Sequence, residues 1–162
     1  IALAIKKRLP EWKVFASDFS QGAIDVAKEN AKSLEAEVNF ECSDVLQMRP
    51  FEPKSFDAVV SNPPYIPEQE KMNMEHRVAD CEPLSALFVP HNDPLVFYTR
   101  MIALCEGGML NPGGWLAFEC HTRFAAQVAD LFRASNTRWS QISLIDDLQG
   151  KPRHVFARID LT

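Results

Sequence analysis

The sequence lacks the features of several common protein classes. Its four cysteines form no Cys-x-x-Cys pair and its four histidines are scattered, so neither a disulfide framework nor a zinc site is indicated. It contains no signal-peptide pattern and no apolar run long enough to span a bilayer. Basic residues are also outnumbered, 17 Lys and Arg against 22 Asp and Glu, which argues against non-specific binding to duplex DNA. We therefore expect a cytoplasmic protein with reduced thiols, no metal, no membrane association and no direct nucleic-acid partner.

The composition favours one globular domain. The chain has 162 residues, of which 46% are hydrophobic, enough for a substantial core. It opens with helix-like residues and no initiator methionine, from Ile1 to Ile5. We expect it to be a fragment of a longer protein.

Hydrophobic periodicity and turn residues predict an alternation of helices and strands. Helices are expected over 1–9, 20–34 (N-cap Ser20; buried stripe Ile24, Ala27, Ala31 and Leu34), 94–105 and 121–134 (apolar face Phe124, Val128, Leu131 and Phe132). Strands are expected over 14–18, 38–42, 56–61, 115–119, 139–145 and 154–159, with a turn at 111–114. Residues 66–93 are predicted to be a long irregular loop, of the kind that often forms a lid or contacts substrate.

This alternation is typical of an α/β fold with a doubly wound, mostly parallel sheet. No helix is expected between the last two strands, so they should form an antiparallel hairpin at one edge. A parallel sheet that ends in an antiparallel pair resembles a Rossmann-like class I S-adenosylmethionine (SAM)-dependent methyltransferase.

The most informative motif is Asn62-Pro63-Pro64-Tyr65, which directly follows the apolar strand 56–61. Neither proline has a backbone N–H, so the turn offers carbonyl acceptors without nearby donors. Asn62 adds a side-chain carbonyl and Tyr65 a flat ring, a combination suited to a planar, uncharged –NH2 group. The same residues also fit an ordinary strand-terminating turn. Their position favours function, because ligands of open parallel sheets bind at the carboxyl ends of strands.

Nearly the whole chain resembles the HemK-type protein-(glutamine-N5) methyltransferases, which modify peptide chain release factors. The similar segments are Ala16–Ser20 with Ala23, Ala27 and Glu29–Ala31; Ser43–Val45; Ser61–Ile66; Glu82-Pro83 with Ala86-Leu87; Asp93, Leu95 and Tyr98; Pro112–Gly114; Glu119; and Asp147-Leu148 with Gly150–Arg153. Asn-Pro-Pro-Tyr alone is shared with amino-group DNA methyltransferases. The Glu-Pro…Ala-Leu and Gly-Lys-Pro-Arg segments are more particular to the glutamine enzymes.

Two acidic residues are expected to bind the cofactor SAM. Asp18 ends the strand 14–18, where its carboxylate can accept from both hydroxyls of a ribose, with Phe19 beside the adenine edge. Asp44 follows the strand 38–42, where it could receive the adenine amino group while Val45 packs on the ring. Alternatively, Asp18 caps the following helix and Asp44 forms an Asx turn. Asn62 is also expected to contact the cofactor.

The resemblance implies methylation of the glutamine amide in the Gly-Gly-Gln motif of a release factor. Asn62 and the Pro63 carbonyl are then the expected acceptors for the amide protons, with Pro64 and Tyr65 lining the substrate side. Residues 1–162 are expected to be a methyltransferase catalytic domain that lacks its first strand, its glycine-rich cofactor loop and the family's N-terminal helical domain. His121, where the family usually has glycine, is interpreted as a helix-start residue and not as a base.

Two other functions fit parts of the pattern. An adenine-N6 nucleic-acid methyltransferase could use the same loop on a flipped base, although the net acidity opposes it. A non-catalytic fragment that binds SAM or a partner protein is the second alternative, because part of the cofactor cradle is missing.

Overall fold

The computed structural model describes residues 1–52, 55–67, 88–89, 93–135 and 139–160, and these divide into two compact units. The first unit spans Ile1–Glu52 and the second Pro53–Thr162. Most of the loop expected over 66–93 lies outside the described residues. Within it, Ile66–Pro67 and Phe88–Val89 form short strands that pair with each other.

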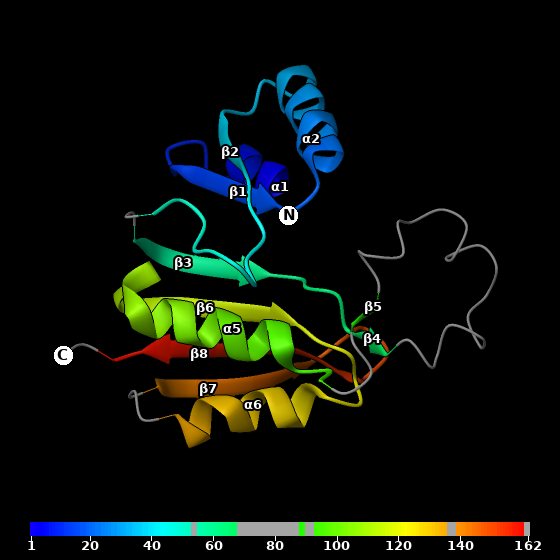
Figure 1. Cartoon of the computed structure of the whole chain (residues 1–162), viewed down its shortest axis with the longest axis vertical. Coiled ribbons are helices and arrows are strands. Elements are labelled where there is room, and N and C mark those ends of the chain that lie inside the picture. Colours follow the sequence, from blue (N-terminus) through cyan, green and yellow to red (C-terminus); the bar gives the residue numbers. More distant parts are fainter. Residues whose placement is uncertain (53–54, 68–87, 90–92, 136–138, 161–162) are drawn as a thin grey trace. The chain divides into compact units, whose positions relative to one another are not determined.

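The first unit consists of two helices and a two-stranded parallel sheet (Figure 1). Its elements are α1 (Ala2–Arg8), β1 (Val14–Asp18), α2 (Gln21–Ser33) and β2 (Val38–Cys42). The strands pair in register from Val14 opposite Val38 to Asp18 opposite Cys42. Asp18 therefore ends its strand beside the last residue of β2, and both strand ends lie at one edge.

The ends of α2 follow from its sequence. Ser20 is the N-cap, as predicted, and its hydroxyl accepts from the Ala23 N–H at 3.3 Å. At the other end, the Glu35 N–H donates to the Lys32 carbonyl at 3.1 Å and the Ala36 N–H to the Ala31 carbonyl at 2.9 Å. With Glu35 at φ 50°, this is the Schellman pattern of helix termination.

The predicted buried stripe of α2 is correct in part. Ile24 and Ala31 are buried, and Ala27 is partly buried. Leu34 is 46% exposed, so its predicted burial is wrong. The reason is the Schellman turn, which reverses the chain directly after Leu34 and buries Ala36 instead.

The second unit is built on a four-stranded sheet with strand order β3-β6-β8-β7 (Figure 1). Its elements are β3 (Phe56–Ser61), β4 (Ile66–Pro67), β5 (Phe88–Val89), α5 (Val96–Leu104), the π-helical turn η2 (Cys105–Met109), β6 (Leu110–Glu119), α6 (Ala125–Ala134), β7 (Trp139–Asp146) and β8 (Pro152–Ile159). β3 and β6 are parallel, whereas β8 is antiparallel to both β6 and β7. The predicted antiparallel hairpin at one edge is thus confirmed.

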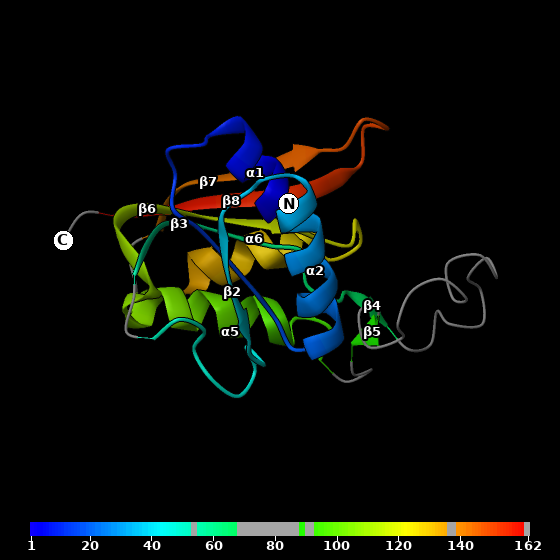
Figure 2. The same ribbon diagram turned by 90° about the horizontal axis from the view of Figure 1, so that it is seen from above.

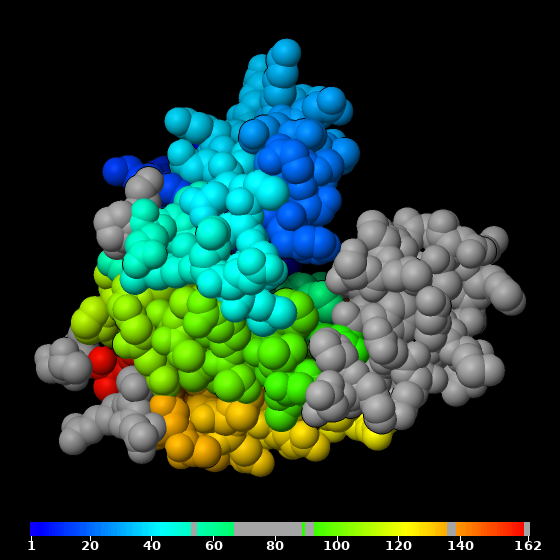
Figure 3. Space-filling view, in the orientation of Figure 1, coloured from blue at the N-terminus to red at the C-terminus, as the bar shows by residue number. Residues whose placement is uncertain are grey.

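Helices α5 and α6 lie on the same face of this sheet (Figure 2). In the space-filling view, α5 (green) and α6 (yellow to orange) form the surface in front of the strands of this unit (Figure 3). Beneath them, aromatic rings connect both helices to the sheet. The ring centroids of Tyr98 and Phe118 are 5.1 Å apart, those of Phe118 and Phe132 6.0 Å, and those of Phe132 and Trp139 4.9 Å. Full burial of each phenylalanine contributes about 2–3 kcal/mol through removal of apolar surface from water.

Strand β6 begins earlier than predicted. Residues 111–114 were expected to form a turn before a strand at Trp115, but they form an irregularity within β6. Phe56 pairs with Leu110 and Ala58 with Trp115, so β6 accommodates extra residues at this point. Gly113, at φ 81°, supplies the turn-like backbone, and its carbonyl accepts from Arg158 Nε at 2.9 Å.

Helix α6 begins at Ala125 and not at His121 as predicted. Residues 122–124 form a turn in which the Phe124 N–H donates to the His121 carbonyl at 2.8 Å. Phe124, Val128 and Phe132 are buried as expected, and Leu131 is partly buried. Among the described residues, none of the helices has the length and apolar character needed to cross a membrane.

Candidate functional site

The loop Asn62–Tyr65 directly follows β3, at the carboxyl end of the sheet of the second unit. The Asn62 side chain is exposed, and its amide has no hydrogen-bond partner among the described residues. Pro63 is buried, and no donor within the described ranges reaches its carbonyl oxygen. The loop therefore carries two acceptor groups that have no partner in the described part of the chain.

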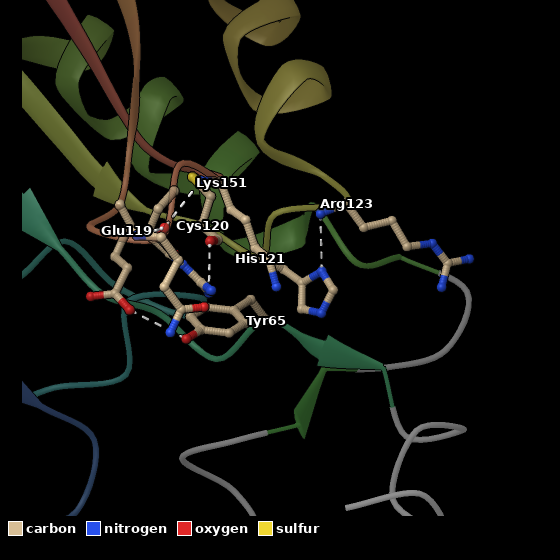
Figure 4. Close-up of polar contacts among 9 residues, drawn as sticks. Tyr65, Glu119, Cys120, His121, Arg123 and Lys151 are labelled. Atoms are coloured by element: carbon tan, nitrogen blue, oxygen red, sulfur yellow. Dashed lines mark hydrogen bonds and ion pairs between the residues drawn. The ribbon is translucent and has the colours of Figure 1, made fainter.

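Tyr65 ends this loop and points toward the end of β6 (Figure 4). Its hydroxyl donates to Glu119 Oε1 at 3.3 Å. Burial and the nearby Glu119 carboxylate raise the pKa of Tyr65 above its usual value, so the phenol stays protonated at neutral pH. The parallel pairing of β3 with β6 places Ser61 opposite Phe118, which brings the segments after the two strands side by side.

The backbone around Glu119 is held by neighbours from two other elements. The fully buried Tyr98 of α5 donates its hydroxyl to the Glu119 carbonyl at 3.2 Å. The Cys120 N–H donates to the Arg153 carbonyl at 2.7 Å, next to the β6–β8 ladder. Burial raises the pKa of the Cys120 thiol to about 12 and also raises that of Tyr98, so both groups stay protonated at neutral pH.

The β7–β8 hairpin is joined to the same segment through Arg153. Its guanidinium contacts the Asp147 carboxylate at 3.4 Å and the Cys120 carbonyl at 3.5 Å. The Asp147 carboxylate also accepts from the N–H groups of Gln149 and Lys151, at 2.9 and 3.1 Å. These backbone bonds, Lys151 first, together with Arg153, lower the pKa of Asp147. Arg153 thus connects the β7–β8 hairpin turn to the end of β6, which carries Glu119.

His121 lies on the other side of Tyr65 (Figure 4). The two ring centroids are 6.0 Å apart with an interplanar angle of 62°, an edge-to-face arrangement. His121 Nδ1 accepts from the Arg123 N–H at 3.2 Å, which orients the imidazole at the turn before α6. His121 therefore lies before the turn that precedes α6, and not at the start of the helix as predicted.

In the first unit, Asp18 and Phe19 lie where β1 ends. Asp18 Oδ1 accepts from the Ser20 N–H at 2.8 Å, and Oδ2 has no partner among the described residues. Phe19 is 52% exposed. A carboxylate with one unused oxygen beside an exposed ring fits a ribose hydroxyl and an adjacent flat base.

Asp44 forms the Asx turn that was the alternative interpretation. Its Oδ1 accepts from the Leu46 N–H and its Oδ2 from Gln47 Nε2, both at 2.9 Å. A carboxylate has about four acceptor positions, so these bonds leave capacity for an amino group. The neighbouring Ser43 is buried and its hydroxyl has no partner in the described structure, while its N–H donates to the Asp18 carbonyl at 2.9 Å. β1 and β2 thus bring Asp18 and Asp44 to one edge.

The structure groups the predicted site residues in two sets. Asp18, Phe19, Asp44 and Val45 share the strand ends of the first unit, and Asn62 to Tyr65 share one loop of the second. Within the described ranges, His, Cys, Asp and Glu side chains form no group of three that could hold a metal ion.

The contacts that sequence reasoning missed are those of Tyr65 with Glu119 and of Arg153 with Cys120. Tyr98, Glu119 and Arg153 had appeared among the residues shared with the glutamine methyltransferases, but without a role. The only sequence signal for a role of these three residues was that the glutamine methyltransferases share them.

Comparison with known proteins identifies the family. Residues 1–83 match the family model described as a methyltransferase domain. The chain belongs to this methyltransferase domain family.

Relatives of this methyltransferase chain carry a more specific name. The release factor glutamine methyltransferase of Bacteroides thetaiotaomicron is 40% identical over 94% of this chain and 54% of its own length. That of Koribacter versatilis is 36% identical over 98% of this chain, again covering 54% of the relative. The resemblance inferred from the sequence is confirmed. The chain spans about half the length of the curated relatives it matches.

Solved structures agree on the fold. The methyltransferase from Pyrococcus furiosus matches with a TM-score of 0.66 at 14% identity, over 98% of this chain and 68% of its own. The catalytic domain of hMettl16 in complex with a MAT2A 3′UTR hairpin matches with a TM-score of 0.69 at 14% identity, over 99% of this chain and 59% of its own. The predicted Rossmann-like class I methyltransferase fold is thereby confirmed.

Proposed function

We propose that the protein carrying this chain transfers a methyl group from SAM to the side-chain amide nitrogen, N5, of the glutamine in the Gly-Gly-Gln motif of a peptide chain release factor. Residues 1–162 would form part of its catalytic domain. The observation that carries the proposal is the pair of unused acceptors, the Asn62 side-chain carbonyl and the Pro63 backbone carbonyl, directly after β3. The names of the relatives support the choice of substrate.

The two acceptors suit a primary amide. A glutamine side chain has two N–H donors on one planar nitrogen, and each acceptor would receive one of them. As the nitrogen acquires the methyl group it becomes positively charged, and both carbonyl dipoles would stabilise that charge. Fixing the nitrogen is important because its lone pair is delocalised and makes it a poor nucleophile. Correct alignment alone contributes several kcal/mol in reactions of this type, on the order of 7 or more in the best cases.

Tyr65 would form the wall against which the flat amide packs. Its raised pKa keeps the ring uncharged, and its hydroxyl is directed to Glu119. The methylated amide is cationic and therefore acidic, so its proton can leave to water without a strong base. His121 is consequently not required as a base.

Asp18, Phe19, Asp44, Val45 and Asn62 are the residues proposed to hold the cofactor. SAM, when bound, supplies an electrophilic methyl group on its sulfonium. The unused Asp18 oxygen would accept from a ribose hydroxyl, and the exposed Phe19 ring would cover the adenine edge. Asp44 would receive the exocyclic amino group through its remaining acceptor positions, with Val45 against the ring.

The test is transfer of a radiolabelled methyl group from SAM to a purified release factor. A Gly-Gly-Ala variant of that factor should remain unlabelled. Asn62→Ala should lower the turnover number about 100-fold, the scale for removal of one preorganised polar group, with a much smaller effect on cofactor affinity. Gln127→Ala, which removes an exposed amide from α6, is the matched control and should retain activity. Unchanged turnover in Asn62→Ala would remove Asn62 from the mechanism.

Two further measurements separate the alternatives. Labelling of DNA or RNA instead of the release factor, together with salt-dependent binding of the nucleic acid, would favour an adenine-N6 methyltransferase. Calorimetric titration with S-adenosylhomocysteine measures cofactor binding independently of activity. Binding without methyl transfer to either acceptor would favour a non-catalytic role.

A further inference from the structure

Glu119 and its neighbour Cys120 are contacted by several elements of the second unit. Its backbone ends β6, opposite His154 of β8. The carbonyl of Glu119 accepts from Tyr98, which reaches it from α5 at 3.2 Å. The next residue, Cys120, exchanges backbone and side-chain contacts with Arg153. The sheet, a helix and the β7–β8 hairpin therefore fix the point from which the Glu119 side chain extends.

The Glu119 carboxylate uses only part of its capacity within the described structure. Oε1 accepts from the Tyr65 hydroxyl at 3.3 Å, whereas Oε2 has no partner among the described residues. The bond pairs a phenol donor with a carboxylate acceptor. The bond joins residues 54 positions apart and connects the Asn62–Tyr65 loop to the end of β6.

The Tyr65 ring is constrained at a second point. The edge-to-face contact with His121 acts on the ring, while Glu119 acts on the hydroxyl at its far end. Since His121 is itself oriented by the Arg123 N–H, the segment 119–121 acts on both the ring and its hydroxyl, and Arg153 also acts on the hydroxyl (Figure 4). Asn62 and the prolines have no comparable side-chain bond among the described residues.

We infer that Glu119 is a positioning residue that holds the Tyr65 ring in the orientation needed to pack against the glutamine amide that accepts the methyl group. This inference rests on the proposed function. Glu119 acts through Tyr65, so its loss should affect turnover only while Tyr65 can donate a hydrogen bond. A residue that merely stabilises the fold would have no such dependence.

The contact itself can be tested without activity. The chain contains two tyrosines, Tyr65 and Tyr98, and in protein selectively labelled with ¹³Cζ-tyrosine the NMR signal that Tyr65→Phe removes belongs to Tyr65. Glu119→Met removes the acceptor, and Glu119→Gln retains an amide oxygen in its place. We expect Glu119→Met to shift the Tyr65 signal clearly and Glu119→Gln to shift it less. An unmoved Tyr65 signal in both variants would overturn the inference.

Kinetics test the role. Glu119→Met should lower kcat for methyl transfer about tenfold, the effect of losing one hydrogen bond to a charged group. KM for SAM should stay within about twofold, and Glu119→Gln should recover most of the lost rate. In a Tyr65→Phe background, Glu119→Met should have almost no further effect, because the two changes remove the same bond. Additive losses in the double variant would overturn the inference.

Glu106 provides the matched control. Its carboxylate lies in the same unit and accepts hydrogen bonds from Ser135 and from Trp139 Nε1, the latter at 2.8 Å. Glu106→Met should lower stability and leave kcat unchanged. If the unaltered protein transfers no methyl group, the proposed function fails alone, and the NMR comparison still decides whether Glu119 holds Tyr65.

Discussion

Gly114 allows a sharp test of the β3–β6 pairing that places the Asn62–Tyr65 loop beside Glu119. A Cβ atom at this position would lie 2.8 Å from the Asn111 carbonyl oxygen, 2.9 Å from the Asp57 carbonyl oxygen and 2.9 Å from Leu110 Cδ1. Two of these neighbours are backbone atoms, one of them on β3. Neither can move away without distorting the pairing of the strands.

Gly114→Ala should therefore lower the free energy of unfolding by about 1–3 kcal/mol, the usual range for overpacking. With a urea m-value of about 2 kcal/mol per molar, a loss of 2 kcal/mol moves the midpoint down by about 1 M. Trp115 and Trp139 lie in this unit, so tryptophan fluorescence reports its unfolding. A Trp12→Phe background removes the signal from the other unit.

Gly107 is the matched control for this experiment. No atom lies within 4 Å of a Cβ placed there, and its φ of −75° suits alanine. Gly107→Ala should leave the midpoint unchanged or raise stability by up to about 1 kcal/mol. If Gly114→Ala unfolds at the same urea concentration as the parent, then β6 does not approach β3 as closely at Gly114 as described.

Two further predictions concern titratable groups. Because the folded state lowers the pKa of Asp147, its contribution to stability is present above the unfolded pKa of about 3.9 and is lost as the pH falls through the folded value. The difference in unfolding free energy between the parent and Asp147→Asn should therefore shrink from about pH 6 to about pH 3 in urea titrations; a constant difference would contradict the Asp147 contacts. Iodoacetamide at about pH 8 should label the exposed Cys42 much faster than the buried Cys105 and Cys120, the latter with its raised pKa, as measured by peptide mass spectrometry. Comparable labelling of Cys42 and Cys120 would show that the core around Tyr98 is open.

Local patterns predicted the strands well where turn residues bound them. The bounds of β1, β2 and β3 agree with those expected from the sequence, because each apolar run ends at a clear polar or proline signal. The pattern was less informative at 111–114, where a turn was expected before the strand but Gly113, at φ 81°, lies within β6. β6 stays paired with β3 on both sides of this irregularity because Leu110 pairs with Phe56, which is far away in the sequence.

The candidate site was predictable only in part. Asn62 and Asp18 could be placed at strand ends because a polar residue after an apolar run marks such an end. The bond from Tyr65 to Glu119 depends on the register of β3 against β6, which no local pattern specifies. The burial of Ala36 in place of Leu34 likewise followed from the geometry of a helix end and not from the 3.6-residue period.

The position of β8 has a consequence for biosynthesis. This strand follows the other strands of its unit along the chain, yet it lies between β6 and β7 in the sheet. A ribosome that has made residues up to 146 has therefore produced two strands whose partner does not yet exist. Their exposed edges are sites for pairing with other chains, so the nascent protein is vulnerable to aggregation until Pro152–Ile159 has been synthesised.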